Sequence, residues 1–265
     1  MLFLLPFAAH AFQLTQLSHS AAVASRVPSP ALLLGIGEAV EGTVPATIGD
    51  AKTAFQAAFR RPVSGPQQGF VNEMLTATVL AMASTSYRPS RIFYLGFESL
   101  CTTFLIGTVT DSEKVQLKSA LCTAVGLNEA RLVKEADALT SFAAGKTEDE
   151  LLASEDFVAA KGSLKYSYPL GAGLLALMPM VGAEVNEATI EKWSAALGLP
   201  AARLSKDNAF FEDAQRKLVE VRQMMMEMSA AAKRKEAAKL KEEAEKAAKE
   251  AEEAESAASE AAEQA

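Results

Sequence analysis

The chain has 265 residues, of which 49% are hydrophobic, enough to bury one sizeable core or two small ones. Alanine, leucine, glutamate, lysine and methionine dominate, and these unbranched residues favour helix because they lose little rotamer freedom there. The net charge of −7 argues against a nucleic-acid partner, since such a partner needs a basic face that displaces counterions from phosphates.

Residues that commonly carry chemistry are scarce. The only two histidines, His10 and His19, lie in a leading segment that we expect to be removed, so the mature chain lacks the commonest general base and metal ligand. Cys101 and Cys122 lie far apart; they could bridge, but they indicate neither a disulfide framework nor a zinc site. The sequence therefore predicts no enzyme activity, no catalytic residue, no cofactor and no metal site.

The nearest approach to a catalytic motif is Gly145-Lys146-Thr147. A phosphate-binding loop also needs a glycine five residues before Gly145, where Thr140 stands, and a buried strand before it. We interpret the segment as a helix end followed by a helix cap. Nucleotide binding through Lys146 is the rival hypothesis.

Residues 1–45 have the composition of a targeting presequence. The apolar run Met1–Ala9 resembles the centre of a signal peptide, and it is too short to span a bilayer as a helix. From Gln13 to Gly37 the chain has several hydroxyl residues and no acid, as transit peptides do. This order is typical of the two-part presequences of plastids bounded by extra membranes; an ordinary secreted protein is the alternative.

Apolar positions at three- and four-residue steps, together with helix caps, predict an all-α multi-helix bundle over residues 46–232. Thr110–Glu113 and Thr147–Glu150 are predicted capping boxes, and Gly126 and Gly198 are predicted helix ends. The apolar stretch Leu170–Val181 is predicted to be a buried helix. Helices are expected to start near residues 47, 67, 90, 110, 128, 147, 170, 186 and 200.

The last predicted helix changes character along its length. A heptad seam runs through Phe211, Ala214, Leu218, Val221, Met225, Met228 and Ala232. Residues 233–265 form a charged tail of alanine, lysine and glutamate, which ion pairs one turn apart can hold as a solvated helix. The methionines of the seam are predicted to fill gaps in helix packing, whereas Met224 and Met226 lie off the seam.

Two nine-residue segments, Gly126–Lys134 and Gly198–Lys206, match at six positions. Each follows one amphipathic helix and opens another. We interpret them as a duplicated helical unit of about seventy residues; convergence on a common helix hairpin is the alternative.

Several short motifs follow one another along the chain: Phe55–Pro62 (FQAAFRRP), Asn72–Leu75 (NEML), Tyr87-Arg88, Phe93–Phe97 (FYLGF), Tyr166-Ser167 and Gly173-Leu174. In this order and spacing they resemble the thylakoid formation protein family, also described as a photosystem II biogenesis factor, over roughly Thr47 to Lys241. The segments 63–69 and 168–169 depart from the family pattern, which indicates a divergent, algal-type member.

The resemblance implies an all-helical protein of the plastid stroma, associated peripherally with the thylakoid membrane. Its implied role is non-enzymatic: it supports photosystem II assembly and repair as an adaptor or stabiliser of the thylakoid FtsH-type protease. No cofactor and no nucleic acid are implied. A structural protein that self-associates through the seam at 211–232 is the alternative.

Five residues are predicted to contact a partner: Arg61, Tyr87, Arg88, Met224 and Met226. The first three lie at breaks between predicted helices, where the favoured alternative is that they fix the helix junctions by hydrogen bonds. The two methionines lie off the heptad seam and offer an adaptable apolar surface.

Overall fold

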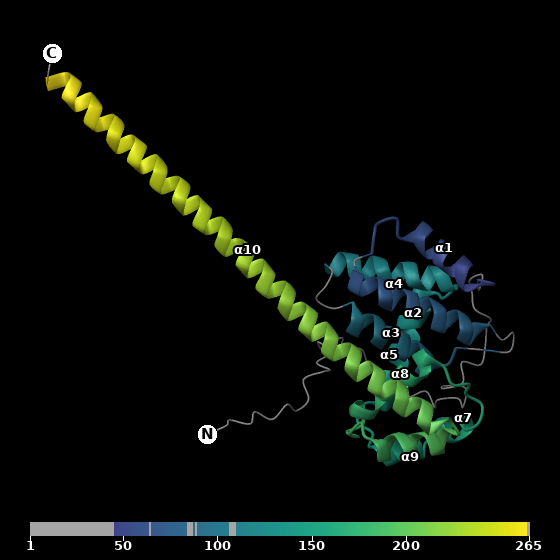
Figure 1. Ribbon diagram of the computed structural model, residues 1–265. Helices are drawn as coiled ribbons and strands as arrows, with labels where there is room; N and C mark the ends of the chain where they lie inside the picture. Colours follow the sequence, from purple (N-terminus) through teal and green to yellow (C-terminus); the bar gives the residue numbers. More distant parts are fainter. Residues whose placement is uncertain (1–44, 64, 84–86, 88, 106–109, 264–265) are drawn as a thin grey trace, which may run out of the picture.

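The computed structural model describes residues 45–63, 65–83, 87, 89–105 and 110–263, and these ranges form helices without a strand (Figure 1). The predicted all-α fold is confirmed. The predicted leader, apart from Pro45, lies outside the described residues. The helices are α1 Ile48–Ala58, α2 Gly65–Met82, α3 Arg91–Phe104, α4 Asp111–Val125, α5 Glu129–Ala143, α6 Glu148–Leu152, α7 Glu155–Ala160, α8 Tyr168–Met180, α9 Glu187–Leu197 and α10 Ala201–Glu263.

The predicted helix starts agree with these bounds within a few residues, with three differences. Helix α2 begins at Gly65 rather than at Gln67. The single short helix expected after Thr147 is two helices, α6 and α7, separated by a turn at Ala153. Helix α8 begins at Tyr168 rather than at Leu170.

Polar caps open the helices much as predicted. Thr147 and Glu150 form a complete capping box at α6. At α4, the hydroxyl of Thr110 accepts from the backbone N–H of Glu113 at 3.3 Å, but the described residues include no return bond from the Thr110 backbone to the Glu113 carboxylate. The predicted box at α4 is therefore only half formed.

Glycine ends α4 and α9 in the same way. Gly126 and Gly198 adopt left-handed φ angles of 73° and 71°, which only glycine reaches without strain. At each end the following backbone N–H bonds back across the cap, at 2.9 and 2.8 Å. Both halves of the predicted repeat thus share one helix–cap–helix geometry, while the duplication itself stays a prediction.

The body is organised around the crossing of α3 and α8. A Cβ added at Gly96 would lie 1.7 Å from the carbonyl oxygen of Pro169, and one added at Gly173 would lie 1.9 Å from that of Ile92. The two backbones therefore touch, and side chains of both helices enter the two hydrophobic cores on either side.

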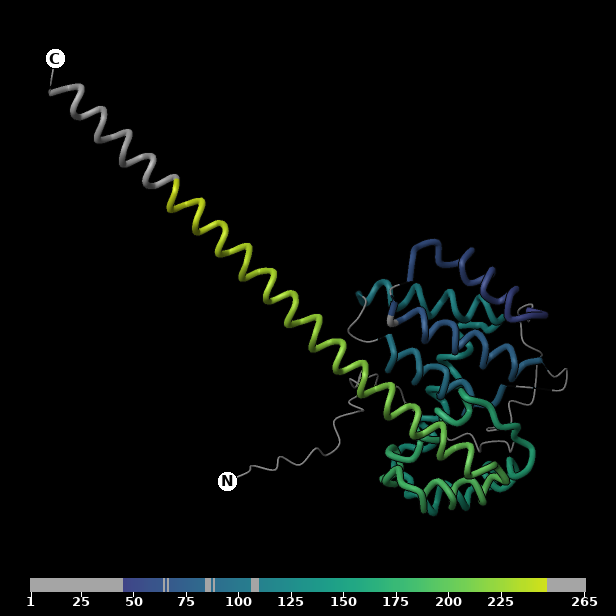
Figure 2. The backbone as a smooth tube through the Cα atoms, in the orientation of Figure 1, coloured from purple at the N-terminus to yellow at the C-terminus, as the bar shows by residue number. Residues whose placement is uncertain are grey.

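The two cores divide the helices between them. The first is formed mainly by α1 to α4 and includes Phe93 and Phe97. The second is formed mainly by α5 to α9, with further residues from α3 and α10, and includes Phe157 and Trp193, whose rings meet edge to face at 5.9 Å. Figure 2 shows α1, α2 and α4 at one end of the body and α9 at the other.

Helix α8 is buried along most of its length, as predicted for the apolar stretch that it contains. Within the described part of the chain, no helix combines the length and the apolar character needed to cross a bilayer.

Helix α10 packs on α9, α8 and α3 near its start and then leaves the body as one long rod (Figure 1). From Arg222 to Lys246 every side chain is exposed. At 63 residues the helix is about 95 Å long.

Candidate interaction surface

The base of α10 is anchored on the body by aromatic and polar contacts. The ring of Phe211 lies 4.8 Å from that of Tyr168, measured between centroids, and Phe211 is buried. The hydroxyl of Tyr166 donates to Asp207 at 2.6 Å, and the guanidinium of Arg203 lies 5.2 Å over the Tyr166 ring. Burial, together with the bond to Asp207, raises the pKa of Tyr166, so that this hydroxyl stays protonated at neutral pH. These contacts fix the direction in which α10 leaves the body.

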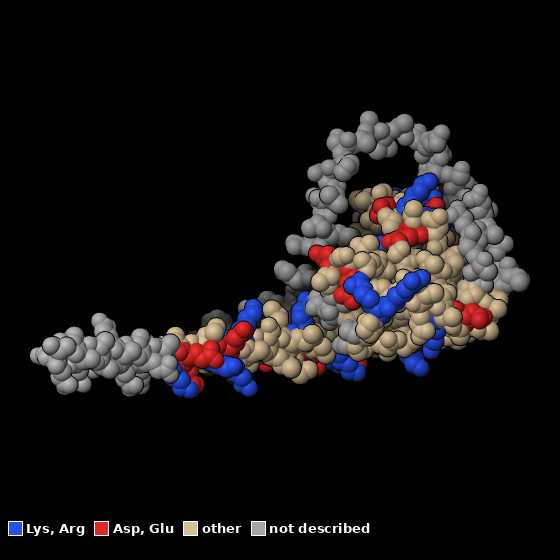
Figure 3. All heavy atoms as spheres, turned by 90° about the horizontal axis from the view of Figure 1, so that it is seen from above, with Lys and Arg blue, Asp and Glu red and all other residues tan. Residues whose placement is uncertain are grey.

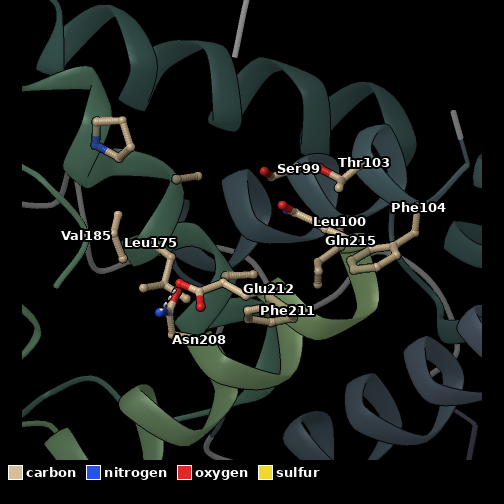
Figure 4. A pocket seen from close by; sticks show the side chains of 13 residues that line it. Ser99, Leu100, Thr103, Phe104, Leu175, Val185, Asn208, Phe211, Glu212 and Gln215 are labelled. Carbon is tan, nitrogen blue, oxygen red and sulfur yellow. Dashed lines mark hydrogen bonds between the residues drawn. The ribbon is translucent and has the colours of Figure 1, made fainter. Parts of the chain in front are cut away.

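A shallow groove of about 200 Å³ runs along this base, between α3, α8 and α10. In Figure 4, Leu100, Phe104 and Phe211 give the groove an apolar floor. Asn208 and Glu212 stand at its edge, joined by a hydrogen bond of 2.9 Å.

The heptad seam of α10 is divided between two environments. Phe211, Ala214 and Leu218 pack against the first core. Met225 and Met228, on the same seam, are 52% and 67% exposed. The prediction that these two methionines fill gaps in packing is therefore wrong for this chain, because the body ends before the helix reaches them.

Met224 and Met226 are also exposed, at 54% and 67%. All four methionines thus lie exposed within residues 224–228, which we call the methionine segment, on the part of α10 that has left the body. Flexible thioether side chains adapt to partners of different shape. Whether Met224 and Met226 contact a partner stays a prediction.

Beyond the methionine segment the helix is covered with charges of both signs (Figure 3). Lys246 pairs with Glu242 at 2.9 Å, an ion pair one turn apart of the kind expected from the sequence. Such exposed pairs contribute only a few tenths of a kcal/mol each, about 0.3–0.5, which is enough to support a solvated helix.

Arg61 lies at the exposed turn between α1 and α2. Its guanidinium donates to the side-chain oxygen of Gln116 on α4 and lies 5.4 Å from the ring centroid of Phe59. Arg61 therefore fixes a helix junction, the second of the two roles considered for it, and keeps part of its surface open to solvent.

Tyr87 is only 8% exposed and its ring meets that of Phe93 edge to face. Burial raises the pKa of its hydroxyl, which interacts with the side chain of Ser167. Such a position leaves little surface for a partner. Ser167 was not singled out in the sequence for this contact, although it belongs to the tyrosine–serine motif. Arg88 lies outside the described residues.

The structure does not bring the predicted contact residues into one site. Arg61 lies at the end of the body that carries α1 and α4, whereas the methionine segment lies on the rod beyond the body (Figure 1).

The remaining candidates have structural roles. Gly145 has a left-handed φ of 77°, the ammonium of Lys146 lies 3.7 Å from the Phe142 ring centroid, and Thr147 caps α6. The segment is thus the helix end and cap that we expected. Cys101 and Cys122 are buried free thiols.

Comparison with known proteins identifies the family. A family model described as "Thylakoid formation protein" matches residues 47–240, most of the chain. The chain belongs to the thylakoid formation protein family. The match covers α1 to α9 and the methionine segment, and it ends inside the charged tail.

Relatives in this family are distant in sequence, but the alignments with this chain cover most of their length. Protein Thf1 of Synechococcus sp. (strain CC9605) is 27% identical over 205 residues, which cover 75% of this chain and 95% of that protein. Protein THYLAKOID FORMATION1, chloroplastic, of Oryza sativa subsp. japonica is 26% identical, covering 74% of this chain and 73% of the rice protein. The solved structure of Psb29 at 1.55 Å is similar in fold, with a TM-score of 0.65 and 24% identity, covering 73% of this chain and all of that one.

Proposed function

We propose that this thylakoid formation protein acts inside plastids, in the stroma and at the thylakoid surface, as a non-enzymatic factor for photosystem II assembly and repair. Its finer role is that of an adaptor or stabiliser of the thylakoid FtsH-type protease. The family membership and the chloroplast relative from rice support the place and the process.

One observation carries the adaptor role. The apolar seam that anchors α10 on its own body continues past the body as the exposed methionine segment. Exposed apolar side chains on a solvent-exposed stretch of helix cost solubility, and a partner helix or groove that covers them recovers the burial free energy. The rod places this segment outside the body, where a large membrane-bound assembly can reach it.

The test replaces Met224, Met225, Met226 and Met228 with glutamine, which keeps helix propensity and length while removing the apolar surface. The matched control changes Val219 and Leu240, two exposed apolar residues on the same helix, to glutamine. In a strain that lacks the gene, the control is expected to restore protease abundance and photosystem II repair, and the methionine variant is not. Normal protease levels and normal repair without the gene would contradict the proposal.

Self-association through the seam at 211–232 is the second candidate, and the same exposed seam residues favour it. Lysine substitutions at Met225 and Met228 test this self-association. Leu218 is left unchanged because it packs against the body of its own chain, so that its substitution would also destabilise the fold. A dimer that these changes convert to a monomer would support self-association. A monomer of the unmodified chain at micromolar concentration in analytical ultracentrifugation would contradict it.

A further inference from the structure

The end of the body formed by α1, α2 and α4 carries two adjoining clefts that share Arg61. The first, of about 490 Å³, lies between the turn after α1 and α4 and is lined by Arg60, Gln116, Ser119 and Thr123, among others. The second, of about 170 Å³, lies between α1 and α2; its polar lining includes Lys52, Gln56, Gln68 and Asn72. We call the pair the basic clefts.

Every charged residue that lines the basic clefts is a cation: Lys52, Arg60 and Arg61. This composition contrasts with the net charge of −7 of the chain. The nearest acid along α4 is Glu113, one turn before Gln116 and outside the lining. Figure 3 looks onto this end of the body, where Lys and Arg side chains are exposed together with Asp and Glu side chains.

Lys52 is the one of the three cations for which the fold gives no structural reason. Arg61 is held by Gln116 and Phe59. In the part of the chain that the structure describes, Lys52 and Arg60 are exposed and take part in no ion pair or hydrogen bond. The helix dipole favours a cation beside the C-terminal end of α1, which accounts for Arg60, but it gives no reason for Lys52 in the first half of that helix.

We propose that the basic clefts bind an acidic peptide segment of a protein partner. Guanidinium and ammonium groups pair with carboxylates, and arginine does so with two parallel hydrogen bonds. The amide side chains of Gln56, Gln68 and Asn72 each donate and accept, which suits the N–H and C=O groups of a peptide backbone. Phosphate and lipid headgroup oxygens would use only the donors. This site is separate from α10 and does not depend on the proposed function.

The test measures binding of a fluorescent peptide of fifteen residues that alternates glutamate with alanine, and of the same peptide with glutamine for glutamate, to the full chain. Lys52→Glu with Arg60→Glu reverses two charges and leaves the contacts of Arg61 in place. Lys134→Glu with Lys206→Glu is the matched control, because both lysines are exposed and the net charge changes equally. Inorganic phosphate and vesicles with anionic lipid are tested in parallel.

We expect the glutamate peptide alone to bind, with an affinity that falls as salt rises because these exposed charges are screened. The first double variant is expected to weaken binding by about tenfold or more, and the control by less than about twofold. Equal weakening of peptide binding by both variants would overturn the proposal. So would a chain that binds vesicles or phosphate but not the peptide, if the first variant abolishes that binding. The thermal midpoints of both variants show whether the fold is retained.

Discussion

Gly96 and Gly173 set how closely α3 and α8 approach each other. An alanine methyl at Gly96 would lie 1.7 Å from a backbone carbonyl oxygen, and a backbone cannot move aside as a flexible side chain can. We expect Gly96→Ala to lower the free energy of unfolding by about 3 kcal/mol or more, because the two central helices must separate. Urea unfolding followed by circular dichroism measures this change.

Gly69 on α2 is the matched control for that substitution. A Cβ at this exposed position meets no atom within 4 Å. Alanine there is expected to raise stability by about 0.5–1 kcal/mol, because it restricts the unfolded chain and favours helix. Losses of similar size at Gly69 and Gly96 would contradict the close crossing.

The two cysteines provide a second test at the scale of single residues. Burial raises the pKa of Cys122 from 9.0 to about 12 and raises that of Cys101 well above 9.0, so neither forms thiolate at neutral pH. At pH 8 we expect alkylation by iodoacetamide to be at least about a hundredfold slower in the folded chain than in urea. A cysteine placed at the exposed Lys134 should react at the rate of a free thiol.

The raised pKa of the buried thiols makes the free energy of unfolding depend on pH. Because the folded state binds the thiol protons more tightly than the unfolded state, this contribution is complete below pH 9 and is lost as the pH rises towards 12. Replacing Cys122 with alanine should remove part of that loss in urea unfolding at alkaline pH. An unchanged pH dependence, or fast labelling at pH 8, would contradict the burial of the thiols.

Single caps could be predicted from sequence and single contacts could not. Threonine, asparagine and glycine caps act within four residues, so local spacing contains the information for Thr147, Gly126 and Gly198. The burial of Tyr87 depends on Phe93 and Ser167, which are brought beside it only by tertiary packing. The position of Tyr87 at a helix break therefore did not indicate that its side chain is buried.

At the scale of elements, the divided seam of α10 gives the third prediction. Leu218→Lys places a charge against the first core and is expected to lower the free energy of unfolding by about 1–3 kcal/mol. Met225→Lys, one heptad later, is expected to change it by less than about 0.5 kcal/mol because that side chain is exposed. Thermal and urea unfolding of the two variants measure the difference. Equal losses would show that the body, or a second copy, covers both positions.

Elements with strong periodicity were predictable, and their partners were not. The unbroken apolar stretch Leu170–Val181 predicted the buried α8, and the helix expected from about residue 186 to Gly198 is α9. Helix α7 has only six residues, too few for a periodic pattern to stand out. A heptad seam says which face is apolar but not where the covering surface ends, so the exposure of Met225 and Met228 needed the three-dimensional structure.

For the whole molecule, the body and the charged tail are predicted to be separable. Side chains from Gln223 to Lys246 are exposed. Ending the chain after Ala232 should therefore leave the thermal midpoint unchanged within about 1 °C, since surface changes of this kind are nearly neutral. The full chain should show a maximum dimension above about 100 Å in small-angle X-ray scattering, and the shortened chain a smaller one. A fall in the midpoint would mean that the tail folds back on the body.

Family and fold could be predicted at this scale because ordered motifs over some two hundred residues are specific together even when each is weak. The basic clefts could not, since their lining comes from three stretches of chain, represented by Lys52 on α1, Asn72 on α2 and Gln116 on α4, which meet only when these helices pack together.

Because α10 is one continuous helix, the direction in which each tail side chain points around the helix axis is fixed relative to the body. In one unbroken helix each residue turns the chain by about 100° and advances it by about 1.5 Å. Inserting two residues after Ala232 would therefore rotate everything beyond by about 200° while lengthening the rod by only about 3 Å. A partner that binds both the body and the tail would then face the opposite side of the tail and bind less tightly. Binding of a partner that contacts the methionine segment alone would be unchanged.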